Sequence, residues 1–251
     1  MGWITELFMM KNRSFFAVKV GCALALFVAI PGWTLLADSL ETKLEARKAE
    51  FSGKASPEVA AGYEEGIKTV AESGIYANAL QVGGKAPEFM LKDINGKEVR
   101  LSDLLKKGAV VLTWYRGGWC PYCNIALAAF QERLPEFDAL GARIVALTPE
   151  LPDYSAETVK QNGLGFDVLS DPGNKVAKQY GIVFKMTPYV AEAMQKNAKL
   201  HARNGDDSDE LPLSATYIIA PDGTVTYAYL EADYRKRAEP DDLLKKLAEM
   251  Q

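Results

Sequence analysis

The sequence predicts an α/β domain with a central mixed sheet flanked by helices, a three-layer sandwich. From about residue 82 onward, short apolar segments rich in β-branched residues alternate with helical segments, as expected for layers of strands and helices. A second observation is composition: 251 residues, 48% hydrophobic and 25% charged, are typical of a globular chain with room for one large or two small domains.

Residues 1–37 are expected to be a signal peptide or a membrane anchor. Basic side chains precede an uncharged run over residues 20–37, and its apolar core, residues 20–30, is 11 residues long. A core of this length favours a cleaved signal peptide over a spanning helix. In either case we expect the domain that follows to be exported to the periplasm or another extracytoplasmic space.

Residues 38–81 are expected to form a helical N-terminal extension that packs on the main domain. Ser56 followed by Pro57 is typical of a helix start, because serine caps the first turn and proline is tolerated at the first helical position. Gly74 favours a helix stop. Apolar residues then recur at three- and four-residue intervals and form one stripe: Val59, Tyr63, Ile67 and Val70.

Residues 82–251 are expected to form the main α/β domain. Asn95-Gly96 and 221–223 predict hairpin turns. Strands are expected at 88–91, 99–101, 109–115, 143–147, 166–169, 215–219 and 225–229. Helices are expected at 102–105, 124–134, 156–161, 174–180, 186–200 and from 240 to the end, with Leu243, Leu244 and Leu247 facing inward. Residues 203–209 are expected to form a solvated acidic loop.

The most informative stretch joins a buried strand to a helix through a tight turn. Gly117 and Gly118 end the strand at 109–115, and Cys120 and Cys123 then open the helix. A C-x-x-C pair in this context predicts a thioredoxin-like redox site. Cysteines in a first helical turn face free backbone N–H groups and the positive end of the helix dipole, which favour the thiolate. Their spacing also allows a reversible disulfide with little backbone movement.

Composition excludes several other classes of function. The net charge of −4, without a cluster of basic residues, argues against a nucleic-acid partner. A zinc site needs four ligands, whereas the chain has one histidine, His201, and its third cysteine, Cys22, lies in the N-terminal apolar run. There is also no nucleotide or flavin fingerprint. We therefore expect no metal and no organic cofactor, and a separate protein must supply reducing equivalents.

Several segments together resemble a known family. They are 84–89, 114–123, 169–172 leading to Tyr180-Gly181, and 216–223. This set resembles the alkyl hydroperoxide reductase/thiol-specific antioxidant family, peroxiredoxin-like proteins of the thioredoxin superfamily, over about residues 82–250. Residues 116–123, with a late Asp233-Tyr234, resemble a branch of that family that carries a Cys-Pro-Tyr-Cys motif.

The motif departs from both of its parent patterns. In the peroxiredoxin pattern F-Y-P-x-x-x-T-x-x-C, Cys123 takes the peroxidatic position, Arg116 replaces the proline and Cys120 replaces the threonine. Ser214 stands where the family's distant arginine is expected. In the thioredoxin pattern W-C-x-x-C, which matches from Trp119, Cys120 is instead the attacking thiol, but Ala215 stands where thioredoxins carry a cis-proline.

Cys120 and Cys123 are thus the candidate catalytic residues, and which of them attacks is open. Helix geometry favours Cys120, at the exposed tip, as the nucleophile and Cys123 as the resolving thiol, whereas alignment with the family favours Cys123. Arg116 is either a cation beside the thiolates or a solvated turn residue. Trp119 is either a wall facing the substrate or a half-buried aromatic.

The resemblance implies an antioxidant oxidoreductase that reduces hydroperoxides. One cysteine is oxidised to a sulfenic acid, the other condenses with it to a disulfide, and a thioredoxin-like protein restores the pair. One alternative is thiol–disulfide exchange on protein substrates without peroxidase activity. A second is a non-enzymatic redox-sensing module. Contact with a membrane is expected only through the N-terminal segment, if it is uncleaved.

Overall fold

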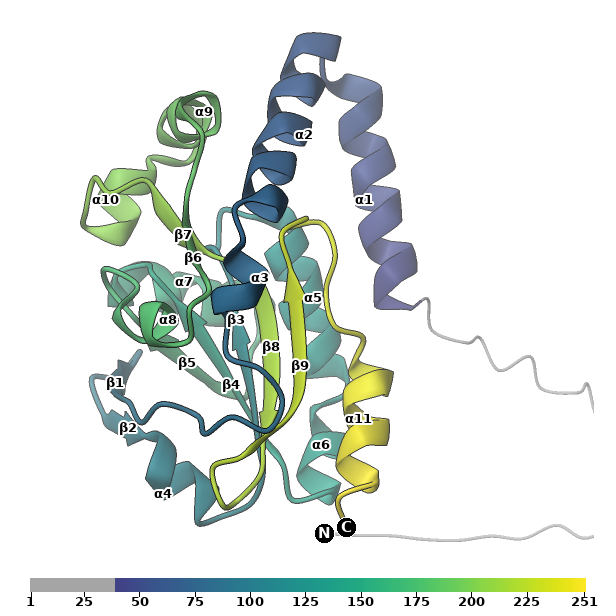
Figure 1. The fold of residues 1–251 in the computed structure, drawn as a ribbon, viewed down its shortest axis with the longest axis vertical. Coiled ribbons are helices and arrows are strands. Elements are labelled where there is room, and N and C mark those ends of the chain that lie inside the picture. Colours follow the sequence, from purple (N-terminus) through teal and green to yellow (C-terminus); the bar gives the residue numbers. More distant parts are fainter. Residues whose placement is uncertain (1–38) are drawn as a thin grey trace, which may run out of the picture. The chain divides into compact units, whose positions relative to one another are not determined.

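The computed structural model describes residues 39–251 of the chain, so the predicted signal peptide or anchor lies outside the described residues. The strands are β1 (Met90–Asp93), β2 (Glu98–Arg100), β3 (Val110–Trp114), β4 (Arg143–Thr148), β5 (Asp167–Ser170), β6 (Val183–Lys185), β7 (Glu210–Pro212), β8 (Ser214–Ile219) and β9 (Val225–Glu231). Seven of them form one sheet in the order β2-β1-β5-β4-β3-β8-β9 (Figure 1). β3, β4 and β5 are parallel and the outer pairings are antiparallel, which confirms the predicted mixed sheet.

Helices cover both faces of this sheet. The helices are α1 (Leu40–Lys54), α2 (Pro57–Glu72), α3 (Ile75–Asn78), α4 (Leu101–Leu105), α5 (Pro121–Glu132), α6 (Leu134–Ala139), α7 (Pro152–Asn162), α8 (Lys175–Gln179), α9 (Pro188–Ala198), α10 (Leu200–Asn204) and α11 (Pro240–Ala248). α5, α6 and α11 pack on one face, and α3, α4 and α8 contribute to the core on the other (Figure 1). The three-layer α/β prediction is therefore confirmed.

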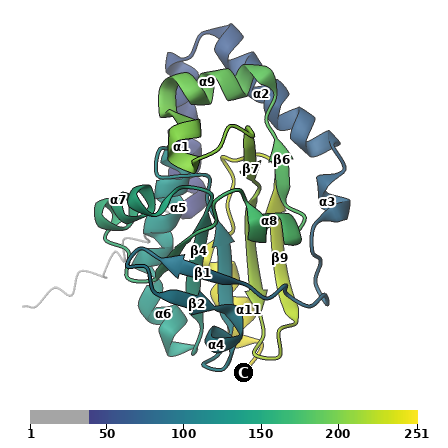
Figure 2. The same ribbon diagram turned by 90° about the vertical axis from the view of Figure 1, so that its left-hand side faces the viewer.

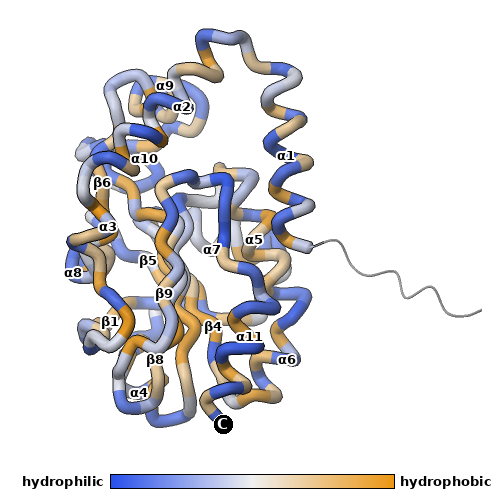
Figure 3. Tube along the Cα trace, turned by 45° about the vertical axis from the view of Figure 1, so that its right-hand side comes forward, coloured by the Kyte–Doolittle hydropathy of each residue, from blue (hydrophilic) through white to orange (hydrophobic). Residues whose placement is uncertain are grey.

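Strand β3 is buried on both faces because it lies inside the sheet between two layers of helices. Leu112 packs into the core beside α4 and α8, while Val111 faces α5, α6 and α11. A strand buried on both sides is continuously apolar rather than alternating. Hydropathy drawn along the chain shows the same contrast: β4 is hydrophobic between its polar end residues, and α11 alternates between polar and apolar residues (Figure 3). Such a strand is a rigid base for the residues that follow it.

The helical extension packs at the end of the domain where β3 leads into α5. α1 packs along α5, and α2 crosses α9 (Figures 1 and 2). The carboxylate of Glu239 accepts from the backbone N–H of Leu40, 3.3 Å away, and so holds the first turn of α1. Gly66 allows the close approach of α2 to α9, since a Cβ there would lie 2.8 Å from Cγ2 of Val190.

Several local predictions are wrong. The helix expected at 186–200 is divided between α9 and α10, because Lys199 adopts a left-handed conformation with φ +53°. β6 precedes these two helices in the chain and β7 follows them. The two strands pair in a separate two-stranded sheet, which was not predicted. The expected loop at 203–209 begins inside α10, and Asn204 is buried. The strand expected at 88–91 begins only at Met90, the first residue of β1 that pairs with β2, because the carbonyl of Phe89 accepts from the backbone N–H of Leu101 at the start of α4.

No helix within residues 39–251 is long and apolar enough to cross a membrane.

Candidate redox active site

The two cysteines lie at the carboxyl end of β3, in the first turn of α5. Cys120 is the N-cap residue of that helix and Pro121 occupies its first position. Neither sulfur reaches solvent, since both cysteines are 0% exposed. The expectation of an exposed first cysteine is therefore wrong: α1 packs along α5, and the segment 232–237 packs over its first turn through Tyr234 and Arg237.

Each sulfur has its own arginine. Nη2 of Arg116 donates to Sγ of Cys120 at 3.2 Å, and Nη2 of Arg237 donates to Sγ of Cys123, also at 3.2 Å. Both arginines are buried, with exposed fractions of 6% for Arg116 and 9% for Arg237. A buried cation without an anion is costly, so this arrangement favours negative charge on the sulfur pair. Of the two interpretations of Arg116, the structure places it beside a sulfur.

The pKa values of the two cysteine thiols are shifted in opposite directions. Burial by itself would raise the pKa of the Cys120 thiol, but a hydrogen bond from Cys123 and the charges of Arg116 and Arg237 bring that pKa well below its ordinary value. Burial, together with the hydrogen bond to Cys120 and the negative charge there, raises the pKa of Cys123 well above its ordinary value, against the opposing effect of both arginines. The arrangement therefore favours a thiolate at Cys120 and a thiol at Cys123.

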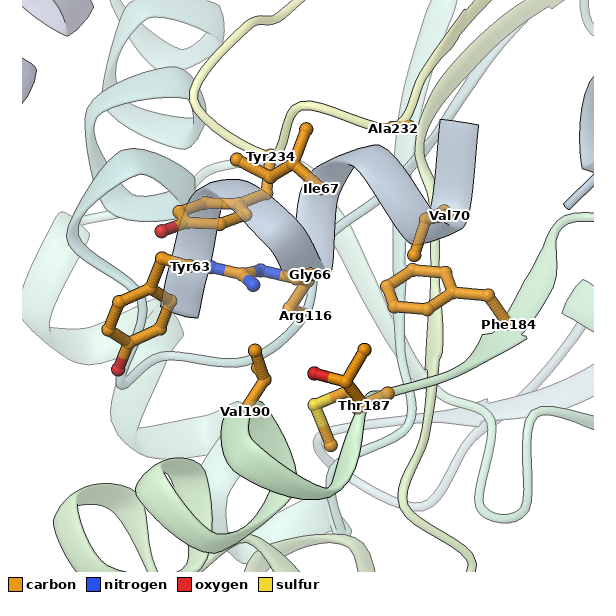
Figure 4. A pocket seen from close by; sticks show the side chains of 11 residues that line it. Tyr63, Gly66, Ile67, Val70, Arg116, Phe184, Thr187, Val190, Ala232 and Tyr234 are labelled. Carbon is orange, nitrogen blue, oxygen red and sulfur yellow. The ribbon is translucent and has the colours of Figure 1, made fainter. Parts of the chain in front are cut away.

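Aromatic rings enclose the Arg116 guanidinium. Its central carbon lies 3.8 Å from the ring centroid of Tyr234 and 5.1 Å from that of Trp119. Figure 4 shows the Arg116 guanidinium beside the Tyr234 ring. The Tyr63 ring lies at the same end of the pocket, and Val190 lies across the pocket from Tyr234. Stacking on ring faces holds a guanidinium without neutralising it. The positive charge of Arg116 is therefore not neutralised by the rings and can stabilise a thiolate at Cys120. Burial raises the pKa of the Tyr234 phenol to about 12, so this phenol is neutral.

A buried carboxylate fixes the turn between Arg116 and Cys120. Glu150, which is 0% exposed, follows β4 and accepts from the backbone N–H of Gly118 at 2.8 Å. Arg203 from α10 pairs with the other oxygen of the same carboxylate. The carbonyl of Gly118 accepts from the Asn124 side chain at 2.8 Å. Because both peptide groups of this glycine are held by side chains, the turn has little freedom to shift.

The turn also has no room for side chains. A Cβ on Gly118 would lie 2.2 Å from Oγ1 of Thr158, and Gly117 has φ +151° with Trp119 atoms 2.3 Å from where its Cβ would be. Only glycine fits both positions.

No group of three or more His, Cys, Asp or Glu side chains that could hold a metal ion occurs within residues 39–251. The chemistry that these residues can perform is thiol chemistry: a buried thiolate, a neighbouring thiol in hydrogen-bonding contact, and two guanidinium groups. Because the sulfurs are covered, a substrate reaches Cys120 only when part of that cover shifts, whether Arg116, α1 or the segment 232–237.

Four residues of this site were not predicted as site residues: Arg237, Tyr234, Glu150 and Arg203. Arg237 is the most important, because it is a second arginine beside the sulfurs although Ser214 stands at the position expected for one. The late Asp233-Tyr234 motif was the available signal, since Arg237 follows it within the same short segment. Glu150 and Arg203 are joined only by tertiary contact and carry no local signal.

The fold and the sulfur pair together define a thioredoxin-like thiol protein. Its family is shown by sequence: residues 82–228 match the AhpC/TSA family, and the chain belongs to that family.

Curated relatives carry two kinds of name. Thiol-disulfide oxidoreductase ResA of Bacillus thuringiensis is 35% identical over 104 residues, covering 41% of this chain and 59% of the relative. The putative peroxiredoxin bcp of Haemophilus influenzae is 33% identical over 105 residues, covering 42% of this chain and 67% of the relative. The chain thus spans less than two thirds of the first of these relatives.

Among solved structures, peroxidoxin BcpB from Mycobacterium tuberculosis superposes with a TM-score of 0.55 at 22% identity, over 68% of this chain and 99% of that one. This likeness shows the thioredoxin-like fold.

Proposed function

We propose that the protein is a thiol peroxidase that reduces hydroperoxides through Cys120 and Cys123. The observation that carries this proposal is that each of the two fully buried sulfurs accepts a hydrogen bond from its own buried arginine. The distance from Nη2 to Sγ is 3.2 Å in both pairs. A buried thiolate accepts a small peroxide more readily than a folded protein substrate. Guanidinium groups also stabilise the negative charge that moves from sulfur to the leaving oxygen.

Cys120 is the attacking sulfur in this mechanism. Its thiolate forms a bond to the terminal oxygen of the peroxide, the O–O bond breaks, and the remaining alkoxide or hydroxide takes a proton from water. Cys120 becomes a sulfenic acid. The sulfur of Cys123 then attacks it and loses its own proton, hydroxide leaves as water, and a disulfide forms. Arg237 favours this step because its charge assists the loss of that proton.

The disulfide is returned to two thiols by an external dithiol protein of thioredoxin type. The family membership supports this partner. The apolar run over residues 20–37 supports export of the domain, and recovery of the protein from the extracytoplasmic rather than the cytoplasmic fraction of cells tests that proposal.

Thiol–disulfide exchange is the second candidate, and the similarity to the protein named thiol-disulfide oxidoreductase ResA favours it. It requires access of a larger partner to Cys120, and hence an opening of the segment 232–237 or of α1.

Stopped-flow tryptophan fluorescence tests the proposal, since Trp119 adjoins Cys120. The reduced full-length chain is mixed with hydrogen peroxide, beside Cys120→Ser and Cys123→Ser variants. We expect fast oxidation that is lost in Cys120→Ser, whereas Cys123→Ser still reacts but stops at the sulfenic acid. If peroxide oxidises the pair no faster than free cysteine while a peptide disulfide reacts readily, the exchange function replaces the peroxidase.

A further inference from the structure

The buried redox site carries more positive than negative charge. Arg116 and Arg237 are both buried, and neither forms a salt bridge with a carboxylate among residues 39–251. The Cys120 thiolate balances one of the two guanidinium charges and leaves the other without an anion. An unbalanced charge is costly in a protein interior, where the dielectric constant is low. The site therefore favours the approach of one further negative charge.

Arg116 has donors to spare for such an anion. A guanidinium carries five N–H donors, and the hydrogen bond to Cys120 is the one that Arg116 forms within the described part of the chain. Arg237, by contrast, also donates to the backbone carbonyls of Tyr234 and Lys236. The donors of a guanidinium form a rigid fork that matches the geometry of oxyanions. Arg116 is therefore the group best placed to hold the oxygens of an anionic ligand.

The cavity that leads to Arg116 is lined by positive charge alone. It lies between α1, α2, α9 and the first turn of α5, with a volume of about 280 Å³. Among the described residues its charged lining consists of Arg47 and Arg116, and the neighbouring pocket drawn in Figure 4 has no acidic lining residue either. A cleft lined by one sign of charge concentrates ligands of the opposite sign. In a chain with a net charge of −4, this local excess of positive charge indicates a small anionic ligand.

Size and thiol chemistry narrow the class of this ligand. Both sulfurs are covered, so a folded protein needs the segment 232–237 or α1 to open, whereas a small molecule in the cavity needs only a shift of the Arg116 side chain. A pair of thiols reduces a sulfur–sulfur bond in two successive attacks. Organic S-sulfonates, R–S–SO₃⁻, combine such a bond with one negative charge and three oxygen acceptors. They therefore match the thiols, the unbalanced charge and the free donors of Arg116.

We propose that the site also reduces small organic S-sulfonates. The proposal rests on Cys120 as the nucleophile and on the external dithiol protein of the proposed function, but not on reaction with peroxide. The Cys120 thiolate attacks the sulfur that carries R, a disulfide bond forms between these two sulfurs, and the bond to the SO₃ group breaks, with its electron pair leaving on sulfite. The Cys123 thiol then loses its proton to water and attacks the sulfur of Cys120. The thiolate of R leaves, takes up a proton from water, and the Cys120–Cys123 disulfide remains to be reduced.

Two compounds of similar shape and different charge test the proposal. S-methyl thiosulfate, CH₃–S–SO₃⁻, is an anion, and S-methyl methanethiosulfonate, CH₃–S–SO₂–CH₃, is its neutral counterpart. Rate constants for oxidation of the reduced full-length protein are measured by tryptophan fluorescence, and each is divided by the constant for free cysteine to remove the difference in intrinsic reactivity. We expect the normalised constant to be about tenfold or more higher for the anion. Peptide mass spectrometry should find the Cys120–Cys123 disulfide, with one sulfite released for each disulfide formed.

Arg47→Met removes a positive charge from the cavity, and Arg47 donates a hydrogen bond to Glu50 rather than to either sulfur. The ratio of the anion constant to the neutral constant should fall about threefold or more. Lys48→Met is the matched control, because it removes a positive charge from the next position of α1, outside the cavity lining, and should leave the ratio unchanged. A measurement without any variant is the salt dependence: raising the ionic strength from about 0.01 M to about 0.15 M should lower the ratio in the unmodified protein.

The outcomes separate this activity from the peroxidase. If the two normalised constants are equal, or if neither Arg47→Met nor salt changes their ratio, the site does not select anions and the S-sulfonate proposal is wrong. If hydrogen peroxide oxidises the pair fast but S-methyl thiosulfate reacts no faster than with free cysteine, the S-sulfonate proposal fails and the peroxidase stands. If S-methyl thiosulfate reacts fast and hydrogen peroxide does not, the peroxidase fails and the S-sulfonate reduction stands.

Discussion

Replacing Arg116 with methionine removes the cation nearest to the Cys120 sulfur while keeping an unbranched side chain between the rings of Trp119 and Tyr234. The lost interaction is a buried hydrogen bond of 3.2 Å from a charged donor. Hydrogen bonds of this kind contribute about 1.5–3 kcal/mol. At 1.36 kcal/mol per tenfold change, the loss lowers the ionisation constant of the Cys120 thiol by about 10- to 150-fold and so moves its pKa upward.

The assay is alkylation of Cys120 by iodoacetamide as a function of pH, with peptide mass spectrometry to distinguish it from Cys22 and Cys123. A free cysteine has a pKa of about 8.5. Because the pKa of Cys120 is lowered, its alkylation should stay fast below that pH and decline only as the pH falls through the lowered pKa. In Arg116→Met the same decline should begin at higher pH, with the rate at alkaline pH unchanged.

Arg235→Met is the matched control, because Arg235 is also a buried arginine, which pairs with Asp233 and Glu64 and donates a hydrogen bond to neither sulfur. It should leave the pH profile where it is. The reasoning is refuted if Arg116→Met leaves the profile unmoved. It is also refuted if the rate falls equally at every pH, which would mean that Arg116 controls access rather than ionisation.

Arg237→Met should slow the step in which Cys123 attacks the sulfenic acid and forms the disulfide. More sulfenic acid should then be trapped by dimedone after peroxide treatment. An unchanged amount of trapped sulfenic acid contradicts a role of Arg237 in disulfide formation. Glu150→Ala leaves the backbone N–H of Gly118 and the half-buried Arg203 without their shared acceptor, and it should lower the free energy of unfolding in urea by about 1–3 kcal/mol; a loss below about 0.5 kcal/mol would contradict a role of Glu150 in holding the turn. Gly118→Ala should cost about 1–3 kcal/mol through its clash, whereas Gly53→Ala, in open space within α1, should be neutral or stabilising by about 0.4–1 kcal/mol.

The sequence could predict those parts of the site whose cause is local. The strand at 109–115, the two glycines and the C-x-x-C pair are neighbours along the chain, so propensity and spacing are sufficient to place them. Arg116 is also local, four residues before Cys120. Whether it turned inward or toward solvent was open, because that depends on Tyr234, which arrives from a distant segment.

The rest of the site depends on contacts between segments far apart in the chain. Arg237 lies 114 residues after Cys123, and Arg203 lies 53 residues after Glu150. Pairs like these leave no periodic pattern that a local interpretation could detect. Burial of the sulfurs was missed for the same reason, since it results from the packing of α1 and the segment 232–237 over a helix start that is exposed when considered alone.

The two buried arginines also bear on the redox potential of the pair. In the reduced protein the Cys120 thiolate balances one of the two charges, whereas a disulfide is neutral and leaves both guanidinium groups without an anion. Electrostatics therefore stabilises the reduced form, and each 1.4 kcal/mol of that preference raises the potential of a two-electron couple by about 30 mV. The disulfide should consequently be an electron acceptor that common dithiol proteins reduce readily, so that recovery of the active thiolate is favourable after each oxidation.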